Sequence, residues 1–208
     1  MSSPLTIALP KGRLLDNILE RFQERGLQFR FKDRKLITES EDGSLRGFLV
    51  KNSDLPTYVH HNIAGLGICG EDVLYESGFN FFKLITFDFG RTKMSIAGVQ
   101  SRGEEKAEEW HPPPEITVAT KFPAFTRDYF HTLGIPVQII RLNGSVELAP
   151  LLGLAPYIVD LVETGNTLKA NKLEIKKDLK PIDVYMIANP AYYKINYRKI
   201  NNLIERLR

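Results

Sequence analysis

The sequence predicts an α/β protein in which parallel strands are covered by helices. Short apolar runs alternate along the chain with segments whose apolar residues recur at helical spacing. The first pair is the run LTIAL at 5–9 and a segment in which Leu14, Ile18 and Phe22 share one face, which Gly26 can end. Alternation of this kind is typical of parallel sheets with helices packed on their faces.

The remaining elements follow from the same patterns. Strands are expected at 65–69, 116–120, 137–142 and 157–162, with separate strands at 79–90 and 93–100 and two more within 173–189. A turn at 41–44 between the segments 28–39 and 45–50 predicts a hairpin. Helices are expected at 53–62 with Ser53 or Asp54 as cap, at 70–78, from Thr126 to Gly134, from Ser145 to Leu152, and near the carboxyl terminus with Asn196 as cap. The polar, proline-rich segment 101–115 is expected to be a surface loop.

Composition and charge favour a globular protein that binds a small anion. The 208 residues are 43% hydrophobic and 25% charged, with a formal net charge of +3, which is no footprint for nucleic acid. The single cysteine, Cys69, excludes an internal disulfide and fits a reducing compartment. No stretch approaches the roughly 20 apolar residues that span a bilayer. The amino terminus also lacks a basic region before its apolar run, so we expect a cytoplasmic protein without membrane or nucleic-acid partners.

The most specific motif is VDLVETGNTLKAN at 159–171, where a buried strand ends in a turn that opens a helix. One interpretation is an ordinary strand-to-helix turn in which Thr164 or Thr167 caps the helix and Gly165 supplies a flexible φ. The other is a phosphate cradle, in which backbone N–H groups from Gly165 to Leu168 and the two threonine hydroxyls surround a phosphate.

Two acids precede this turn, and they favour the second interpretation. Asp160 and Glu163 can accept hydrogen bonds from ribose hydroxyls next to a bound phosphate. The segment resembles the phosphoribosyl-diphosphate loop of phosphoribosyltransferases. In that loop the two acids are adjacent, whereas here Leu161 follows Asp160.

Three other turns combine polar residues with a helix start. Lys11 and Arg13 flank Gly12 in LPKGR at 9–13, CGED at 69–72 carries two acids, and NGSVELAP at 143–150 carries Glu147. LPKGR and CGED are compatible with anion sites at helix starts, but an ordinary turn with solvated cations or first-turn acids is favoured for both. For NGSVELAP the alternative is a capped helix carrying one surface acid. The four histidines show no metal-ligand spacing, and Cys69 is expected to be a small buried residue.

Six motifs together resemble the ATP phosphoribosyltransferases of histidine biosynthesis. They occur in that family's order between about residue 5 and residue 190: LTIALPKGRL, SDLPTYV, GLGICGEDVL, ITVATKFPAFTRDYF, LNGSVELAPLLGLA and VDLVETGNTLKANKLE. The resemblance implies a two-lobed fold like that of type II periplasmic binding proteins, with the active site in the interlobe cleft. One lobe would comprise 1–90 and 184–208, and the other, with the phosphoribosyl-diphosphate loop, 91–183.

The resemblance also implies the reaction and its residues. The 5-phosphoribosyl group of 5-phosphoribosyl 1-diphosphate is transferred to N1 of ATP, with Mg²⁺ and release of pyrophosphate. By motif match, Asp160, Glu163, Thr164, Gly165, Asn166, Thr167 and Leu168 would bind phosphoribosyl diphosphate; Lys11, Gly12, Arg13, Lys51, Asp72 and Ser145 would face ATP or the diphosphate; and Lys11, Glu147 and Asp160 would be catalytic. No metal ligand is assigned.

Three positions depart from the family pattern. Lys51 stands where the family usually has arginine, Gly65 where it has an acid, and Ala124 where it often has asparagine. A lysine keeps the charge but loses bidentate recognition of phosphate.

The chain is similar to the short form of the family, which lacks a histidine-binding regulatory domain. The resemblance then implies a homodimer that joins a separate regulatory subunit, similar to a histidyl-tRNA synthetase, in a hetero-octamer. Two other functions remain open: a non-catalytic nucleotide- or anion-binding module of the same fold, and a phosphoribosyltransferase acting on another base.

Overall fold

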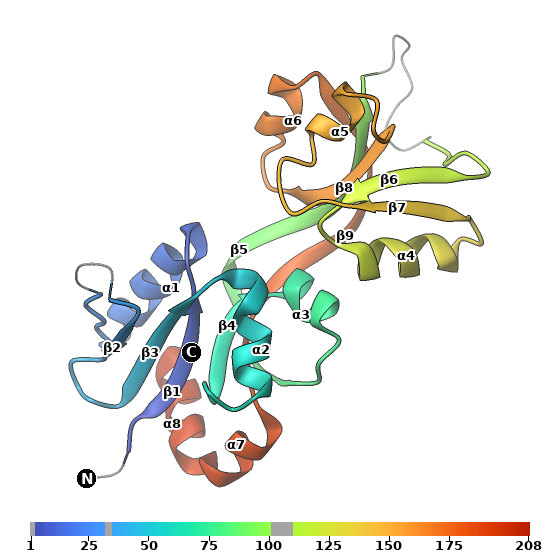
Figure 1. The fold of residues 1–208 in the computed structure, drawn as a ribbon. Coiled ribbons are helices and arrows are strands. Elements are labelled where there is room, and N and C mark those ends of the chain that lie inside the picture. Colours follow the sequence, from blue (N-terminus) through green and yellow to red (C-terminus); the bar gives the residue numbers. More distant parts are fainter. Residues whose placement is uncertain (1–2, 32–34, 101–109) are drawn as a thin grey trace. The chain divides into compact units, whose positions relative to one another are not determined.

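The chain forms two compact units. The computed structural model describes residues 3–31, 35–100 and 110–208. Unit 1 comprises Met1–Gly90 and Asp183–Arg208, and unit 2 comprises Arg91–Ile182. The borders expected from the sequence differ from these by the single residue Asp183. Two long strands, β5 (Phe82–Val99) and β9 (Leu173–Ala188), contribute one part to each unit (Figure 1).

Unit 1 contains a mixed sheet in the order β2-β3-β1-β4-β9. β1 (Leu5–Pro10) pairs in parallel with β3 (Leu45–Val50) and β4 (Leu66–Gly70), whereas β2 (Ile37–Glu39) and β9 pair antiparallel with β3 and β4. The antiparallel pair of β2 and β3 confirms the predicted hairpin, whereas the expectation of parallel strands is wrong at β9. Local hairpin pairing at β2, and the return of β9 from unit 2, account for the two antiparallel pairs.

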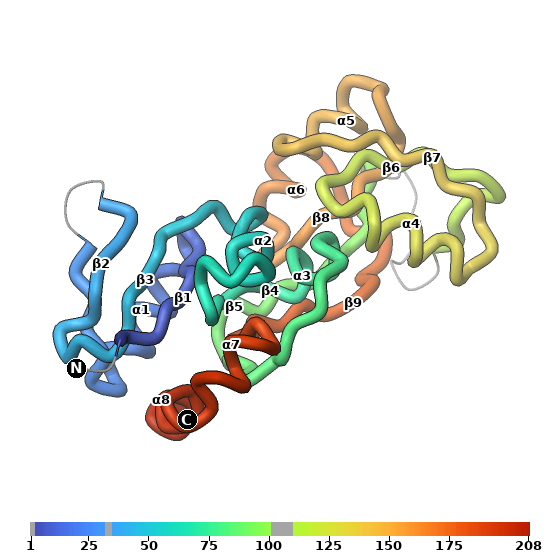
Figure 2. Tube along the Cα trace, turned by 60° about the horizontal axis from the view of Figure 1, so that its bottom comes forward, coloured from blue at the N-terminus to red at the C-terminus, as the bar shows by residue number. Residues whose placement is uncertain are grey.

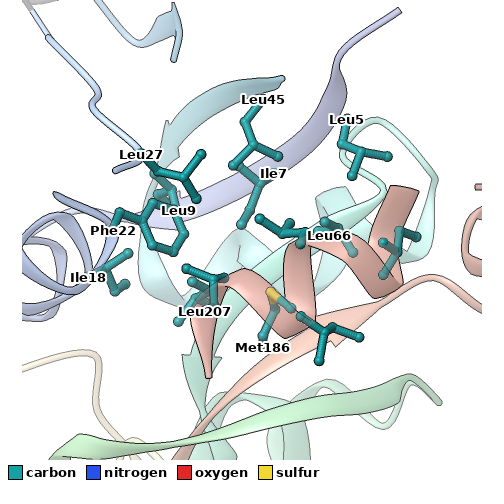
Figure 3. Packing of buried hydrophobic residues seen from close by; sticks show 14 of the residues in the cluster. Leu5, Ile7, Leu9, Ile18, Phe22, Leu27, Leu45, Leu66, Met186 and Leu207 are labelled. Carbon is teal, nitrogen blue, oxygen red and sulfur yellow. The ribbon is translucent and has the colours of Figure 1, made fainter. Parts of the chain in front are cut away.

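Helices cover both faces of this sheet because residues alternate along its strands. On one face Leu5, Ile7 and Leu9 pack against α1 (Arg13–Glu24) and α8 (Tyr197–Leu207), as Figure 3 shows. On the other face Ala8 and Cys69 pack against α2 (Leu55–His60) and α3 (Glu71–Ser77). The remaining short elements of unit 1 are a 3₁₀ turn (Asn52–Asp54) and α7 (Pro190–Ile195).

Unit 2 repeats this layering around the strands β9-β5-β8-β6-β7, given in their order in the sheet. β6 (Ile116–Thr120) is parallel to β7 (Val137–Arg141) and β8 (Tyr157–Val162), and β5 is antiparallel to β8. α4 (Pro123–Thr132) packs on one face, and α5 (Leu148–Leu151) and α6 (Asn166–Ala170) pack on the other (Figures 1 and 2).

Several predicted boundaries are wrong for identifiable reasons. The strands expected at 79–90 and 93–100 are one strand, β5, and those within 173–189 are one strand, β9, because each continues from one unit into the other. In the hairpin, 28–31 makes only an isolated bridge between Phe29 and Ser40, and 32–34 lie outside the described residues. Of the loop at 101–115, residues 101–109 also lie outside them, and 110–115 form neither helix nor strand.

The predicted helices are present more often than the side-chain caps predicted for them. α4 begins at Pro123, a residue suited to the first helical position, and the Thr126 hydroxyl inside the helix donates to the Phe122 carbonyl at 2.7 Å. Residues 53–62 divide into the 3₁₀ turn and α2, and neither Ser53 nor Asp54 makes a side-chain cap.

At the carboxyl terminus Asn196 occupies its predicted cap position, but the side-chain cap bonds are made by Asn189, one helix earlier. Asn189 accepts hydrogen bonds from the Ala191 and Tyr192 N–H groups at 2.9 and 3.2 Å and so caps α7. Asn196 precedes α8 without a side-chain cap bond and donates instead to the Tyr192 carbonyl at 3.1 Å.

Candidate active site

In unit 1, the carboxyl ends of parallel strands bring three of the predicted segments to one edge. Pro10 of β1 lies opposite Val50 of β3, and the Lys11 N–H donates to the Val50 carbonyl at 2.9 Å. Lys11 and Lys51 therefore follow neighbouring strands at the same edge, and both side chains are exposed. This arrangement gathers positive charge where a parallel sheet usually binds its ligands.

Gly12 and Arg13 complete the turn between β1 and α1. Gly12 has φ 102° and ψ −163°, a conformation that L residues rarely adopt. No atom lies within 4 Å of the place a Cβ would take, so the backbone conformation alone calls for glycine here. Arg13 is the first residue of α1 and is exposed.

Asp72 lies at the same edge but is buried. It stands in the first turn of α3, directly after β4, and is 6% exposed. Burial, with a smaller contribution from the Asp72 charge, raises the pKa of the Cys69 thiol, so Cys69 is inert. The preceding acid, Glu71, forms an ion pair with Lys83 at 3.1 Å. Asp72 thus belongs to the framework of this edge more than to its exposed surface.

A second group of predicted residues meets at the carboxyl ends of β6 and β8 in unit 2. Asp160 Oδ1, in β8, lies 3.8 Å from Lys121 Nζ, which directly follows β6. Burial raises the pKa of Asp160, Lys121 opposes that rise, and the negative charge of Glu147 adds to it. These three side chains therefore act on one another electrostatically, which places the two predicted catalytic acids, Glu147 and Asp160, in one cluster.

Asp160 also continues a row of polar side chains across the sheet. Ser95 of β5 lies opposite Asp160, and its hydroxyl donates to Asp178 Oδ1 of β9 at 2.8 Å. Lys93 Nζ is 2.6 Å from Asp178 Oδ2. Hydrogen bonding and charge from Lys93, with the Ser95 hydrogen bond, hold the pKa of Asp178 below its usual value despite some burial.

The TGNTL segment forms a turn between β8 and α6. Gly165 is left-handed, with φ 72° and ψ 5°, and takes the cap position of α6, so neither Thr164 nor Thr167 caps this helix as the first interpretation expected. The Thr164 hydroxyl accepts from the Asn166 N–H at 3.5 Å, Thr167 is exposed, and Leu168 is buried and anchors the helix in the core. The turn thus presents hydroxyls and the first N–H groups of α6 beside Asp160 and Glu163.

Ser145 and Glu147 lie in the turn before α5, also in unit 2. Ser145 has φ 47° and its carbonyl accepts from the Leu148 N–H at 3.1 Å. The cap residue of α5 is Glu147, two residues after the predicted cap Ser145. A serine with positive φ is uncommon and is found at strained turns.

Sequence reasoning missed Lys121 as a site residue. The signal was present, because Lys121 follows the strand ITVAT directly and so belongs at the same edge as Asp160. It also missed Asn52, whose Oδ1 is a buried acceptor without a hydrogen-bond partner in the described part of the chain. Nothing in the sequence distinguishes that asparagine.

The three departures fall in different places. Lys51 is at the carboxyl edge of unit 1, and Ala124 is in the first turn of α4, three residues after Lys121. Gly65 precedes β4, at the opposite edge, and a Cβ there would lie 2.1 Å from the ring of Tyr192. Glycine at 65 is therefore required by Tyr192 packing, away from the substrate residues of unit 1.

Among the described residues, no group of three histidine, cysteine or acidic side chains is placed to hold a metal ion. His60 stacks on Phe79 with ring centroids 3.9 Å apart and meets His61 edge to face at 5.1 Å. Over the same residues, no helix is both long and apolar enough to cross a bilayer.

Comparison with known proteins identifies relatives over nearly the whole chain. The family model HisG, described as ATP phosphoribosyltransferase, matches residues 51–208. An ATP phosphoribosyltransferase of Caldicellulosiruptor saccharolyticus is 44% identical over 207 residues, which cover 98% of this chain and 97% of that protein. One from Clostridioides difficile (strain 630) is 41% identical over 202 residues, covering 96% and 95%.

Solved structures agree with these relatives. A chain of the ATP phosphoribosyl transferase (HisG:HisZ) complex from Thermotoga maritima matches with a TM-score of 0.82 and 36% identity, over 98% of this chain and 96% of that chain. The periplasmic aliphatic sulphonate binding protein SsuA from Escherichia coli matches with a TM-score of 0.59 and 11% identity, over 100% and 72%. The second match concerns the fold alone and confirms the expected likeness to periplasmic binding proteins.

Proposed function

The chain belongs to the ATP phosphoribosyltransferase family, and from that membership we propose how its residues bind and activate the two substrates. The enzyme transfers the 5-phosphoribosyl group of 5-phosphoribosyl 1-diphosphate to N1 of ATP and releases pyrophosphate, the first step of histidine biosynthesis. The roles of individual residues below are our proposal.

Unit 2 binds phosphoribosyl diphosphate. The observation that carries this assignment is the cluster of Lys121, Glu147 and Asp160 next to a hydroxyl-bearing turn with a left-handed glycine. The turn from Thr164 to Leu168 holds the 5′-phosphate with backbone N–H groups and threonine hydroxyls. Asp160 and Glu163 accept hydrogen bonds from the ribose hydroxyls.

Asp160 then acts in the chemical step. When the bond between C1′ and the diphosphate breaks, positive charge develops on the ribose and negative charge on the leaving group. The carboxylates of Asp160 and Glu147 favour the cationic sugar, and Lys121 opposes the rise that burial causes in the pKa of Asp160. No protein nucleophile is needed, and catalysis consists of placement and charge stabilisation.

Unit 1 binds phosphate groups of ATP or of the leaving diphosphate. Lys11 and Lys51 present two exposed ammonium groups at one edge, Gly12 allows close approach of the backbone, and Arg13 adds a guanidinium at the start of α1. Asp72 holds the framework of this edge. In unit 2, Ser145 offers a hydroxyl that can bind a substrate phosphate group.

Mg²⁺ would be bound together with the diphosphate. The described residues contain no three-ligand protein site, which fits an ion held chiefly by substrate phosphate oxygens and one or two carboxylates. Glu147 and Asp160 are the carboxylates in the unit 2 cluster that can supply such ligands. The ion would neutralise charge on the leaving diphosphate.

The chain also works in an assembly. We propose a homodimer that joins a regulatory subunit resembling a histidyl-tRNA synthetase in a hetero-octamer. The support is the similarity to a chain of the Thermotoga maritima HisG:HisZ complex over almost its whole length. A single buried cysteine is consistent with our further proposal that the assembly is cytoplasmic.

The test is pyrophosphate release by the purified chain, alone and with the regulatory subunit, with Mg²⁺, phosphoribosyl diphosphate and ATP each omitted in turn. We expect release only when all three are present. Release with another purine in place of ATP would contradict the acceptor assignment, and no release with either preparation would favour the binding-module alternative.

A further inference from the structure

The amino edge of unit 1 carries a second surface, at the end of the strands remote from Lys11 and Lys51. The Thr6 N–H at the start of β1 donates to the Tyr192 hydroxyl at 3.0 Å, and the Thr6 hydroxyl accepts from the Gly65 N–H at 2.8 Å. These bonds fix α7 beside the amino ends of β1 and β4. Figure 1 shows α7 and α8 at the end of unit 1 where β1 begins.

Exposed apolar side chains gather on this surface. The rings of Phe82, Tyr193 and Tyr197 form a chain, with centroids 5.5 Å and 5.7 Å apart. Phe82 is 40% exposed, Tyr197 55%, and Ile195, between the two tyrosines, 81%. A cluster of large apolar groups at such exposure is typical of a protein interaction site.

The charged residues of the segment that carries Tyr193 and Tyr197 have one sign. Residues 190–202 contain Lys194, Arg198 and Lys199 and no carboxylate. Lys199 donates to the Ser3 carbonyl at 2.8 Å, whereas Lys194 and Arg198 are exposed and form no ion pair with any described residue. In a two-fold contact between copies, the same cations would face each other, which disfavours a second copy as occupant. A partner with carboxylates would instead neutralise them.

A hollow lies beside α8, next to Lys199, Asn202, Leu203 and Arg206. It has a volume of about 310 Å³, and Leu5, Leu45 and Leu203 are among its lining residues. Its two cations are already engaged: Lys199 as above, and Arg206 with Asp42 at 2.7 Å. The hollow therefore suits an apolar anchor side chain better than a small anion.

We propose that Phe82, residues 193–198 and the hollow beside α8 form the docking surface for the regulatory subunit, which would bring an apolar anchor surrounded by carboxylates. This inference rests on the assembly proposed above and names the part of the chain that makes the contact.

The experiment measures binding of the full chain to the purified regulatory subunit by isothermal titration calorimetry. Ile195→Asp is expected to raise the Kd by about tenfold or more, because the exposed Ile195 side chain loses its apolar contact with the regulatory subunit. Leu152→Asp is the matched control, since Leu152 is 78% exposed but lies in unit 2, and its Kd should be unchanged. Lys194→Glu with Arg198→Glu should also weaken binding and reduce its salt dependence.

Thermal unfolding and the mass of each variant without the partner establish that fold and dimer persist. If Ile195→Asp and the charge variant bind as the parent does, or if Leu152→Asp weakens binding equally, the docking surface is wrong. Dissociation of the dimer in the Ile195 variant would show that a second copy occupies this surface, which also overturns the inference. If the parent chain itself binds no regulatory subunit, the proposed assembly fails as a whole, while pyrophosphate release tests the transferase separately.

Discussion

In both units, side chains that follow or end parallel strands gather at the carboxyl edge of the sheet. These side chains are mainly cationic in unit 1 and mainly acidic in unit 2. In unit 1, parallel β1 and β3 end in exposed Lys11 and Lys51. In unit 2, parallel β6 and β8 end near Asp160 and Glu147, with Lys121 as the balancing cation. One edge thus suits phosphate groups and the other suits ribose hydroxyls and a developing sugar cation.

The two edges also differ in how firmly their side chains are held. Lys11 and Lys51 of unit 1 are exposed, so each contributes mainly attraction for phosphate. Asp160 is partly buried and interacts electrostatically with Lys121 and Glu147. Such burial of a carboxylate lowers the stability of the fold and is typical of a catalytic group. The comparison predicts that substitutions in the cluster of Lys121, Glu147 and Asp160 affect the chemical step, and that substitutions of Lys11 and Lys51 affect substrate capture.

The largest effect is expected from Asp160→Asn. Removing the charge that favours the sugar cation should lower kcat by about 10²- to 10³-fold, as loss of a preorganised electrostatic group does. Because burial raises the pKa of the folded carboxyl, its ionised form destabilises the fold above the unfolded-state pKa, so the variant should unfold at an unchanged or higher temperature. Asp178→Asn is the control, and an equal loss of kcat there would contradict a special role for Asp160.

Lys11→Met tests the other side of the comparison. Losing this ammonium group should lower kcat/KM by about 10²-fold, chiefly through KM, since a charge-assisted bond to phosphate is lost. Steady-state kinetics with ATP and phosphoribosyl diphosphate varied separately show which substrate is affected. Lys194→Met, on the remote edge of the same unit, should leave both constants unchanged when the chain is assayed without the regulatory subunit. A fall in kcat alone would place Lys11 in the chemistry.

Thr167→Ala should weaken phosphoribosyl-diphosphate binding by about 1.5–3 kcal/mol, the range for a hydrogen bond to a charged group, while kcat changes less. Gly165→Val should act in the same direction, since φ 72° is strained for a β-branched residue. Thr132→Ala, an exposed threonine in α4, serves as control. Unchanged substrate affinity in both loop variants would remove the phosphate-cradle assignment.

The smallest effect, a shift in pH dependence, is expected from Lys121→Met. Lys121 lowers the pKa of Asp160 against the effect of burial, so its loss should raise that pKa further. Asp160 then takes up its proton at a higher pH, so the acidic limb of the plot of kcat against pH should shift to higher pH. Lys177→Met, an exposed lysine of β9, should not move it. A shift to lower pH would mean that Lys121 does not face an ionised Asp160 during catalysis.

Local patterns predicted the elements well where the signal was confined to one segment. The strands at 116–120 and 157–162 and the amphipathic helices α1 and α8 lie where periodicity placed them. The caps at Thr126, Ser145 and Thr167 were wrong because proline, a positive-φ serine and a left-handed glycine set those helix starts. Cap choice depends on backbone conformation, which residue type does not fix.

By itself the sequence determined the alternating elements, the ordered motifs that the relatives share, and the residue types at each turn. The tertiary structure decided which of these residues meet. It placed Lys121 against Asp160, made β5 and β9 continuous through both units, and put Gly65 under Tyr192. The physical reason is that strand pairing joins segments far apart in the chain, while sequence periodicity reports only which face of an element is buried.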